Sequence, residues 1–516
     1  MSGKAPYGNY AHAVLTNNAG RTPDDIALVY RGTSYSFDAL NRRVNRTANA
    51  LLALGVKPGQ KVASLLGEAL HIAETYFAEA KIGVIIAAFN PYWTPEMVVA
   101  MARQSKIDWL ALDAPNAGIA PLIRAELPHV KLIAIGTTID GAVSLDDAIA
   151  KAPDAEPPIG GAFDDPMGFF YTSGTTGTSK AVVHSHSSCI QMSTVLYEVE
   201  RPADSVWGSG PIIWGIGFPC TIGAAVYAGM KVALEDDLGP AKLLDAVQRE
   251  RISHITMIPS QWGDILSNHP HQDFDLSSLK VILLGGEPIS PNIFSRLMER
   301  LPGLSLYSFY GQSEGPYNCV NTITTAPMAA TSGRARIGQA VQTIGANGDR
   351  VVGVPGEIIM TGPHLFQGYD GQPEKTAEVL KGGWFYTGDL GLMDESGRLT
   401  VLGRKEDAIT RGGHYLRPIQ IEDVAGAIDG VAEAGVAGSP AGASEQKIIL
   451  AVSPKPGVML EETGLRAKLR TMLPTEAMPD LIVVADSLPH GNDASGGRGK
   501  LLRREIRALY EGQLAG

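Results

Sequence analysis

The residues best suited to binding an anion lie between Phe169 and Lys180, where the sequence reads FFYTSGTTGTSK. An apolar, strand-like run leads there into glycines, hydroxyl side chains and one lysine. Glycines let backbone N–H groups approach an anion, hydroxyls donate hydrogen bonds, and Lys180 adds positive charge. The segment predicts a phosphate-binding loop, with a solvated turn as the alternative. The loop residues concerned are Thr172, Ser173, Gly174, Thr175, Thr176, Gly177 and Thr178.

The spacing in this loop differs from G-x-x-x-x-G-K-[ST], so kinase or GTPase chemistry does not follow from it. The elements around it alternate between short apolar runs and amphipathic stretches. Such alternation predicts parallel α/β sheets with helices on both faces. Near Gly356 the strands become shorter and glycine-punctuated, which is typical of antiparallel sheet or a small barrel. The apolar runs begin at Val62, Val84, Trp109, Lys131, His254 and Val281.

The pattern changes again after Arg404. A helical pattern from Ile421, a strand from Lys447, a helix through Glu461 to Met472 and a strand from Leu481 predict a compact α+β unit. We therefore place a domain boundary near Asp407. The predicted domains are a large α/β domain with a barrel-like part, residues 1–406, and a small domain, residues 407–516.

Composition indicates an ordinary globular protein whose partners are small molecules. The chain has 516 residues, 44% of them hydrophobic and 19% charged, with a formal net charge of −11. This acidic balance without a basic run argues against nucleic acid or an anionic membrane surface as partner. The cysteines are too few and scattered for a disulfide framework or a zinc site, and they indicate a reducing cytoplasm. They are Cys189, Cys220 and Cys319.

Neither a secretory signal nor a membrane span is expected. The N-terminus lacks a continuous apolar segment. The stretch from Val206 to Met230 has no charged residue, but its prolines and glycines would break a membrane helix. We interpret that stretch as a loop followed by a buried helix.

Further motifs follow the phosphate loop in a fixed order. They are LLGGEPIS at Leu283, YGQSEG at Tyr310, GEIIMTGP at Gly356, GWFYTGDLG at Gly383, GRKEDAITRGGHYLRPIQIED at Gly403 and GKLLRREIR at Gly499. This set resembles the ANL superfamily of adenylate-forming enzymes, which includes acyl-CoA synthetases, peptide-synthetase adenylation domains and luciferases. The resemblance spans most of the chain and is strongest for the acyl-CoA synthetase branch.

The resemblance implies a ligase that joins a carboxylate to the α-phosphate of ATP, releases pyrophosphate, and passes the acyl group to coenzyme A. Because two anions must meet, Mg²⁺ and cationic groups are needed to offset their charge. By resemblance, Glu314 is the Mg²⁺ ligand, and Glu314, Lys500, Thr172 and Lys180 are the catalytic candidates. The implied nucleotide-binding residues beyond the loop are Ser313, Gly311, Tyr310 stacking on adenine, and Gly286, Glu287 and Pro288 on the other side of the base.

Further roles are implied for the ribose and for movement of the small domain. Asp389 accepts hydrogen bonds from the ribose hydroxyls, with Arg404 as its partner. Asp407 is the implied hinge about which the small domain rotates between an adenylating and a thioester-forming pose. In the second pose, the turn of Arg411, Gly412 and Gly413 lines the pantetheine tunnel, with Arg411 available to CoA phosphates. In the first, Lys500 bridges carboxylate and phosphate oxygens.

Several positions depart from the family pattern. Ser179 and Ala181 flank Lys180 where proline and glycine are common, Trp214 stands where many members have histidine, and Gln420 replaces a glutamate. The stretch HGNDASGGR before Gly499 is longer than usual, so the lysine loop is expected to be longer and looser. One hypothesis is therefore a variant impaired in adenylation that still thioesterifies a supplied acyl-adenylate. A complete two-step ligase is favoured over it.

The expected acid pocket is mostly apolar or small-sided, which favours a hydrophobic, bulky carboxylic acid over acetate or an amino acid. Other functions stay open. They are a stand-alone adenylation enzyme that loads a carrier protein, a non-catalytic nucleotide sensor, and a luciferase-like oxygenase, for which the sequence has no separate signal. The pocket candidates are Trp214, Ile216, Gly217, Phe218, Gly285, Gly286 and Asn318.

Overall fold

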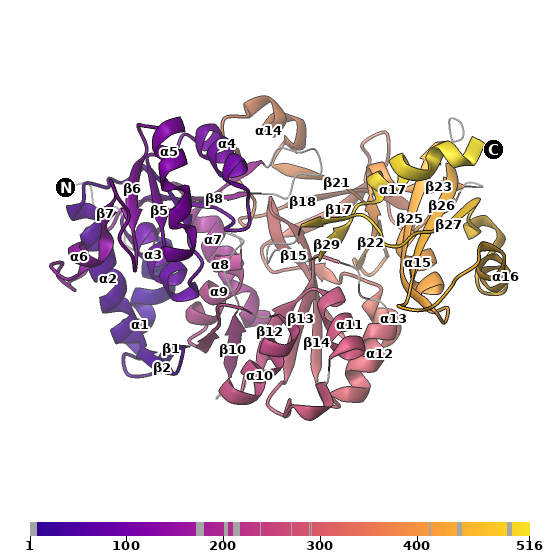
Figure 1. Ribbon diagram of the computed structural model, residues 1–516, viewed down its shortest axis with the longest axis horizontal. Coiled ribbons are helices and arrows are strands. Elements are labelled where there is room, and N and C mark those ends of the chain that lie inside the picture. The colour runs from indigo at the N-terminus through magenta and orange to yellow at the C-terminus, as the bar shows by residue number, and fades with distance from the viewer. Residues whose placement is uncertain are drawn as a thin grey trace. The chain divides into compact units, whose positions relative to one another are not determined.

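The computed structural model (Figure 1) describes residues 8–171, 180–200, 205–209, 217–237, 239–269, 271–287, 289, 291–411, 414–440, 446–492 and 498–515. The chain forms two compact units. The first comprises Met1–Ala329, Gly333–Val341 and Met360–Phe385, and the second comprises Ala330–Ser332, Gln342–Ile359 and Tyr386–Gly516. The domain boundary at Asp407 stays a prediction. The residues just before Asp407 belong to the second unit, together with the C-terminal part of the chain.

The first unit contains a nine-stranded sheet within its described residues. Its central strands run parallel, and antiparallel strands close both edges. In spatial order the strands are β16 (Arg334–Ala335), β15 (Gly315–Ile323), β14 (Ser305–Gln312), β13 (Val281–Gly285), β12 (His254–Met257), β10 (Val206–Ser209), β11 (Lys231–Leu234), β1 (Ile26–Tyr30) and β2 (Thr33–Ser36).

A second sheet of the same unit has eight strands in the described part of the chain. Its inner strands are parallel, and β9 and β19 are antiparallel to their neighbours. In spatial order the strands are β19 (Gly368–Tyr369), β9 (Ala181–Ser185), β8 (Pro166–Tyr171), β4 (Ile85–Ala88), β3 (Lys61–Leu65), β5 (Trp109–Leu112), β6 (Lys131–Ala134) and β7 (Val143–Ser144).

Both sheets are covered on both faces, which explains their continuous apolar strands. On β13, Val281 and Leu283 belong to the core between the sheets, whereas Ile282 and Leu284 belong to a core on the outer face. Successive residues of a strand point to opposite faces, so a strand buried on both sides carries no polar alternation. The predicted α/β class with parallel-rich sheets is confirmed.

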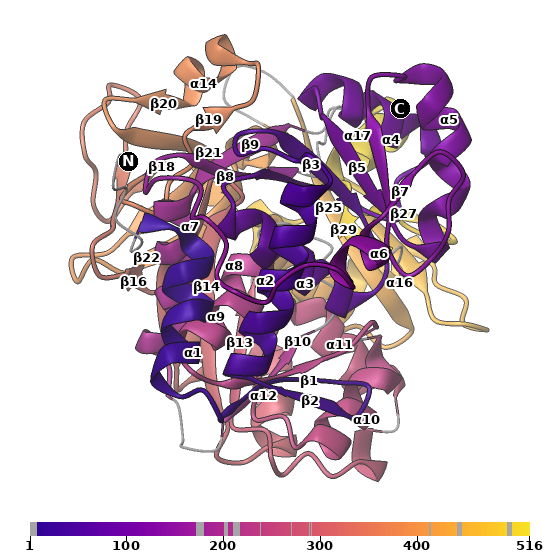
Figure 2. The same ribbon diagram turned by 90° about the vertical axis from the view of Figure 1, so that its left-hand side faces the viewer.

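Helices form the layers around these sheets, as Figure 2 shows. Between the sheets lie α2 (Phe37–Ala53), α3 (Ala69–Lys81) and α9 (Ile222–Tyr227). The outer face of the first sheet packs against α10 (Pro240–Glu250), α11 (Pro259–Asn268) and α12 (Pro291–Arg300), and that of the second against α4 (Pro95–Ser105) and α5 (Ala120–Glu126). Shorter helices of this unit are α1 (Asn17–Arg21), α6 (Leu145–Ile149), α7 (His186–Ser193), α8 (Gly217–Cys220), α13 (Ala326–Ala329) and α14 (Pro373–Val379).

A third sheet corresponds to the predicted barrel-like part and supplies residues to both units. β21 pairs antiparallel with β20 and with β22. The strands of this sheet are β17 (Ala340–Ile344), β18 (Pro355–Thr361), β21 (Trp384–Met393), β20 (Leu380–Lys381) and β22 (Leu399–Arg404).

The C-terminal part of the second unit is the predicted compact α+β structure. Ile448 and Leu450 of its middle strand face one core, and Ile449 and Ala451 face another that includes Ile506. One core also takes residues of two helices, α15 (Pro418–Gly426) and α16 (Glu462–Met472), and the other takes α17 (Arg503–Tyr510). The strands are β25 (Val431–Pro440), β26 (Gln446–Pro454) and β27 (Leu481–Val484), with the pairs β23 (Ile409–Arg411) with β24 (His414–Leu416) and β28 (His490–Asn492) with β29 (Arg498–Leu501).

The uncharged stretch from Val206 to Met230 differs in part from the expected loop and helix. It begins with β10, a buried strand, because its backbone pairs with β11 and β12 and completes the parallel sheet between them. Its buried helical part is α9, as expected. Within the residues that the structure describes, no helix is long and apolar enough to cross a membrane.

Candidate active site

The two ends of the predicted phosphate loop are held by β8 and β9. These strands pair antiparallel with Tyr171 opposite Ala181. The Tyr171 hydroxyl lies 2.7 Å from the Ser105 hydroxyl, and its ring packs edge-on against Phe89 and Trp93 at centroid distances of 5.5 and 5.3 Å. The strand that enters the loop is therefore anchored by a buried aromatic cluster.

Lys180 and Glu314 meet at one tyrosine. The Lys180 Nζ lies 4.6 Å from the centroid of the Tyr369 ring, in a cation–π arrangement. The Tyr369 hydroxyl donates a hydrogen bond of 2.7 Å to Glu314 Oε1. Both Tyr369 and Glu314 are buried, at 6% and 7% exposure. One oxygen of Glu314 is thus fixed, while Oε2 has no hydrogen-bond partner among the described residues.

His184 fixes the turn that carries Glu314 between β14 and β15. Its Nε2 lies 2.7 Å from the Ser313 carbonyl oxygen, and its Nδ1 lies 3.1 Å from the Ser188 hydroxyl. Burial lowers the pKa of His184 to about 4, with the Ser313 carbonyl opposing that shift. The ring is therefore neutral at pH 7. Because a carbonyl can only accept, the ring proton lies on Nε2.

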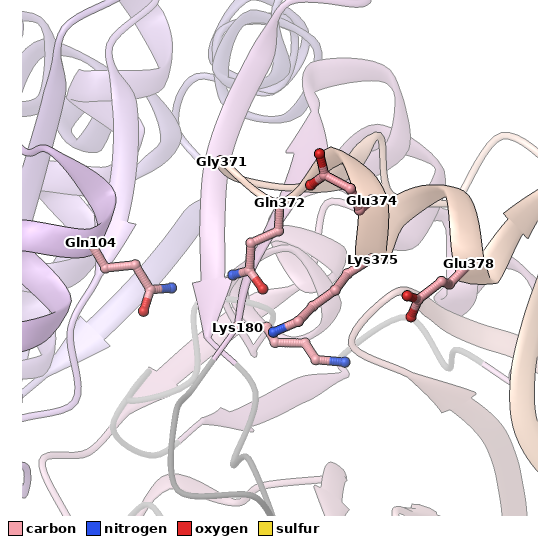
Figure 3. A pocket seen from close by; sticks show the side chains of 7 residues that line it. All are labelled: Gln104, Lys180, Gly371, Gln372, Glu374, Lys375 and Glu378. Carbon is pink, nitrogen blue, oxygen red and sulfur yellow. The ribbon is translucent and has the colours of Figure 1, made fainter.

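A polar cavity of about 600 Å³ opens beside Lys180. Figure 3 shows the Lys180 and Lys375 side chains extending beside each other, while Glu374 points away from them. Gln104 enters from α4, and Gln372 stands just before α14. Glu378 lines the cavity as well, so two lysines and two glutamates balance in charge, and Lys180 at the end of the phosphate loop is the group placed to bind an anion.

The glycine motif after β13 makes a tight turn beside Phe309. A side chain at Gly285 would collide with the Phe309 ring, which lies 2.2 Å from the Cβ position, so this ring covers the face of Gly285. Gly286 has φ +80°, a conformation that favours glycine. Glu287 Oε2 accepts a 3.2 Å hydrogen bond from the backbone N–H of Ser260, which holds the turn against α11.

The YGQSEG motif lies beside this turn, because β14 pairs with β13 and Phe309 is opposite Gly285. Tyr310 lies on β14, nearly buried at 9% exposure, opposite Cys319 of β15. Gly311 allows close approach, because a Cβ there would lie 2.6 Å from the Gly315 carbonyl oxygen. The two strands therefore pack tightly where the motif bears its predicted nucleotide contacts.

The described pocket candidates have different surroundings. Gly217 begins α8, and Phe218 is buried in the core, with its ring centroid 4.7 Å from that of Phe77 and 5.4 Å from that of Tyr76. Asn318 of β15 is fully buried in a polar setting, with Nδ2 3.2 Å from the Nε2 of His364. Asn318 therefore belongs to a polar cluster, and Phe218 to the apolar core.

Asp389 and Arg404 form a cross-strand pair in the second unit. They are opposite one another on β21 and β22, and Arg404 Nε lies 3.2 Å from Asp389 Oδ1. Arg404 Nη1 also donates to the Thr387 carbonyl oxygen at 3.2 Å. Asp389 is largely buried, whereas half of the Arg404 side chain is exposed. Asp389 and Arg404 are thus paired with each other, and their role at the ribose stays a prediction.

The hinge candidate follows immediately. Asp407 ends a short 3-10 helix, Lys405–Asp407, and precedes β23. At the end of β23, the Arg411 guanidinium binds both carboxylate oxygens of Asp480, at 3.0 and 3.2 Å, and donates to the Met478 carbonyl oxygen at 2.9 Å. Arg411 is thus fastened to the small α+β structure, and reaching CoA phosphates would require it to leave Asp480.

The segment before Lys500 is described only at its two ends, because residues 493–497 lie outside the described residues, and the longer, looser loop stays a prediction. β28 pairs antiparallel with β29, which carries Lys500. Downstream, Arg503 of α17 donates a 2.7 Å hydrogen bond to buried Glu422 of α15. Backbone pairing on one side and an ion pair on the other fix the chain around the lysine.

The remaining predictions concern the metal site and the candidates that lie outside the described residues. Within the described residues no group of three or more His, Cys, Asp or Glu side chains is arranged to hold a metal ion. Mg²⁺ in phosphoryl-transfer sites is often held by one or two carboxylates plus substrate phosphates, and Glu314 with its second oxygen available fits that use. Candidates outside the described residues are Thr172, Ser173, Gly174, Thr175, Thr176, Gly177, Thr178, Trp214, Ile216, Pro288, Gly412 and Gly413, together with the side chain of Lys500.

Comparison with known proteins identifies the family. The family model described as AMP-binding enzyme matches residues 15–370. The chain belongs to this AMP-binding enzyme family. A second model, the AMP-binding enzyme C-terminal domain, matches residues 420–496. Within the family, the chain lies in the acyl-CoA synthetase branch of the ANL superfamily, and it is an acid–thiol ligase.

Relatives of this AMP-binding enzyme cover nearly its whole length. A feruloyl-CoA synthase of an Amycolatopsis species is 30% identical over 95% of this chain and 97% of its own. A fatty acid–[acyl-carrier-protein] ligase, ScoC of Streptomyces coeruleorubidus, is 28% identical over 96% of both chains. The crystal structure of ATP-bound MatB from Rhodopseudomonas palustris superimposes with a TM-score of 0.85 at 25% identity, covering 97% of this chain and 99% of that one.

Sequence reasoning on this AMP-binding enzyme missed two residues beside Glu314. Tyr369 fixes its carboxylate and His184 fixes its turn, although both lie far from it along the chain. No spacing pattern links these positions. The polarity of His184 within an otherwise apolar strand was the one available signal, because a buried polar group needs a specific partner.

Proposed function

We propose that the chain converts a hydrophobic, bulky carboxylic acid to its coenzyme A thioester through an acyl-adenylate, using ATP. An oxygen of the acid attacks the α-phosphorus of ATP, and the bond to the pyrophosphate leaving group breaks. The CoA sulfur then attacks the acyl carbon, the thiol loses its proton, and AMP departs. The observation that carries this proposal is the meeting of Lys180 and Glu314 at Tyr369 beside the phosphate loop.

Each described side chain has a role in this scheme. Lys180 offsets phosphate charge at the end of the loop, and Tyr369 orients Glu314 through its hydroxyl. Glu314 would hold Mg²⁺ by its second oxygen, and a bound Mg²⁺ would offset phosphate charge in the first step. Asp389 and Arg404 would hold the ribose.

The small domain, from Asp407 onward, would supply Lys500 in the first step and the Arg411 turn in the second. The pairing of β28 with β29 supports a complete two-step ligase over a variant impaired in adenylation, because it limits the freedom of the segment that carries Lys500.

The test is a panel of carboxylic acids incubated with ATP, Mg²⁺ and CoA, with products identified by mass spectrometry. AMP and an acyl-CoA should appear together for bulky apolar acids, and little should form from acetate or amino acids. Acyl-CoA without any carrier protein distinguishes this function from carrier loading, which the likeness to ScoC keeps as the second candidate. Absence of both AMP and thioester with every acid would point to a nucleotide sensor instead.

A further inference from the structure

Four polar side chains gather beside β15, close to the turn that bears Glu314. They are Asn318, Arg336, Gln339 and His364, called the donor cluster below. Asn318, Arg336 and His364 are buried, at 0%, 2% and 0% exposure, and Gln339 is partly buried. The Arg336 backbone N–H also donates to the Asn318 carbonyl oxygen at 3.0 Å, which joins the segments that carry them.

Hydrogen bonds define how the central amide and imidazole are oriented. Asn318 Nδ2 directs one of its two hydrogens between Gln339 Oε1 at 3.4 Å and the Ala340 carbonyl oxygen at 3.5 Å, so the amide nitrogen is on that side. The same nitrogen lies 3.2 Å from His364 Nε2, which must therefore accept. Burial, aided by the positive charge of Arg336, lowers the pKa of His364 to about 3. The ring is neutral, with its proton on Nδ1.

Three buried nitrogens of the donor cluster have no hydrogen-bond partner in the described structure. They are Arg336 Nη1, Gln339 Nε2 and His364 Nδ1. Each carries hydrogen and none can accept, given the orientation above. Native proteins rarely leave even one buried donor unpaired, because its desolvation is then uncompensated. Three donors within a single cluster are suited to binding a group that offers acceptors only.

Two glycines allow neighbouring residues to pack closely around His364. A Cβ at Gly362 would lie 3.0 Å from His364 Nδ1 and 3.1 Å from Gln339 Cα, so the glycine lets both residues approach the backbone closely. A Cβ at Gly315 would lie 2.6 Å from Met360 Sδ and 3.4 Å from His364 Nε2. Because Gly315 directly follows Glu314, the donor cluster adjoins the turn where the acid is to be activated.

Charges within the cluster are already balanced. Arg336 Nε lies 2.8 Å from Glu198 Oε1, and Arg336 Nη2 donates to the Thr194 hydroxyl at 2.9 Å. With the arginine paired and the imidazole neutral, the unpaired donors need oxygen lone pairs more than they need a compensating negative charge.

We propose that the donor cluster binds an oxygen acceptor of the acid substrate, a carbonyl or a second carboxylate remote from the carboxylate that is activated. The proposal rests on the function proposed above and narrows its substrate class from hydrophobic acids to bulky acids that carry such an oxygen. Arg336, Gln339 and His364 then determine specificity and take no part in the chemical steps.

The test compares acids of similar shape that differ in this group, using the full chain. The two series are hexanoate, 5-oxohexanoate and adipate, and 4-ethylbenzoate, 4-acetylbenzoate and terephthalate. Each acid is measured by calorimetric binding and by kcat/KM for thioester formation. We expect at least one oxygen-bearing acid to exceed its parent by about tenfold or more, because a site built for hydrogen bonds rejects a ligand that lacks them. Within each series, comparison of the oxo acid with the dicarboxylate shows whether a carbonyl oxygen or a carboxylate oxygen is preferred.

The matched variant is Gln339→Met, which removes one unpaired donor from a partly exposed position. It should lose most of the preference at little cost in the thermal stability of the free protein, because Nε2 makes no bond there and the hydrogen bond that Oε1 accepts from Asn318 is long, at 3.4 Å. Ile337→Ala is the control, since Ile337 is 83% exposed in the same segment and should leave the preference unchanged.

The two proposals fail in different ways. Equal binding of parent and oxygen-bearing acids, or no binding by any of them, overturns the donor-cluster proposal. Thioester formation from all acids without a preference overturns it and leaves the ligase function intact. An oxygen preference in binding without AMP or thioester supports the cluster and contradicts the proposed function.

Discussion

The hydroxyl of Tyr369 offers a precise test of the site, because Tyr369→Phe removes one hydrogen bond and keeps the ring. The hydroxyl donates to Glu314 at 2.7 Å, and both residues are buried. The ring under Lys180 at 4.6 Å is retained in phenylalanine. A hydrogen bond to a charged group contributes about 1.5–3 kcal/mol, which corresponds to about 10- to 100-fold in a rate or binding constant.

The assay is ATP–pyrophosphate exchange at varied Mg²⁺ with the best acid of the panel. For Tyr369→Phe we expect kcat/KM to fall by about 10- to 100-fold and the Mg²⁺ requirement to rise, because Glu314 loses the bond that orients it. Thioester formation from a preformed acyl-adenylate should change little, since that step does not assemble the metal and triphosphate.

Tyr369→Leu is the companion variant, which also removes the ring. In the exchange assay its activation free energy should rise by up to about 2 kcal/mol more than that of Tyr369→Phe, because a desolvated cation–π contact contributes up to that amount. An exchange rate for Tyr369→Phe within about twofold of the parent would refute the role given to this hydroxyl. Such a change is well below the effect of losing one ordinary hydrogen bond.

Three other predictions follow from ion pairs and buried histidines. Asp389→Asn should raise KM for ATP about tenfold with little change in Tm, because the partner arginine is half exposed and such pairs contribute about 0–1 kcal/mol to stability; an unchanged KM would remove the ribose role. Burial lowers the pKa of His184 to about 4 and that of His364 to about 3, below an unfolded value near 6.5, so the unfolded chain binds more protons and stability falls as pH drops below 6.5. Each histidine should lower the free energy of unfolding by about 1.4 kcal/mol at pH 5.5 relative to neutral pH. Urea unfolding should show a flatter pH dependence in His184→Gln and His364→Gln, and an unaltered slope would count against buried neutral rings. Burial raises the pKa of Glu422 while Arg503 opposes that shift, so Arg503→Met should destabilise the chain by about 3–5 kcal/mol at pH 7 and by less near pH 4, where Glu422 is protonated. A deficit equal at both pH values would contradict a charged pair.

The layered architecture was predictable because burial on both faces leaves a direct trace in the sequence. The runs at Val62 and Val281 are continuous because neighbouring residues enter different cores. β25 left no such trace and was not predicted. Its Gly435 and Gly438 make room for Ile506 and Ile409, whose atoms would lie 2.6 and 3.0 Å from an added Cβ. In the sequence, a strand whose small residues allow close packing resembles a loop.

The candidate site was predictable where sequence motifs carry both partners of a pair. The pairing of Asp389 with Arg404 follows from two motifs on adjacent strands. Contacts between distant segments were not predictable, as with Tyr369 on Glu314, because no periodicity relates them. The polar surroundings of Asn318 were likewise hidden, since they depend on Arg336, Gln339 and His364 converging from separate segments.

The central claim is that the acid is activated as an acyl-adenylate before the thioester forms. Isotope transfer tests it most directly, using an acid of the panel labelled with oxygen-18 in its carboxylate, together with ATP, Mg²⁺ and CoA. If the acid attacks the α-phosphorus, each AMP released with the acyl-CoA carries one labelled oxygen, and the pyrophosphate carries none. Label in inorganic phosphate with formation of ADP, or thioester formation with unlabelled AMP, would contradict the account.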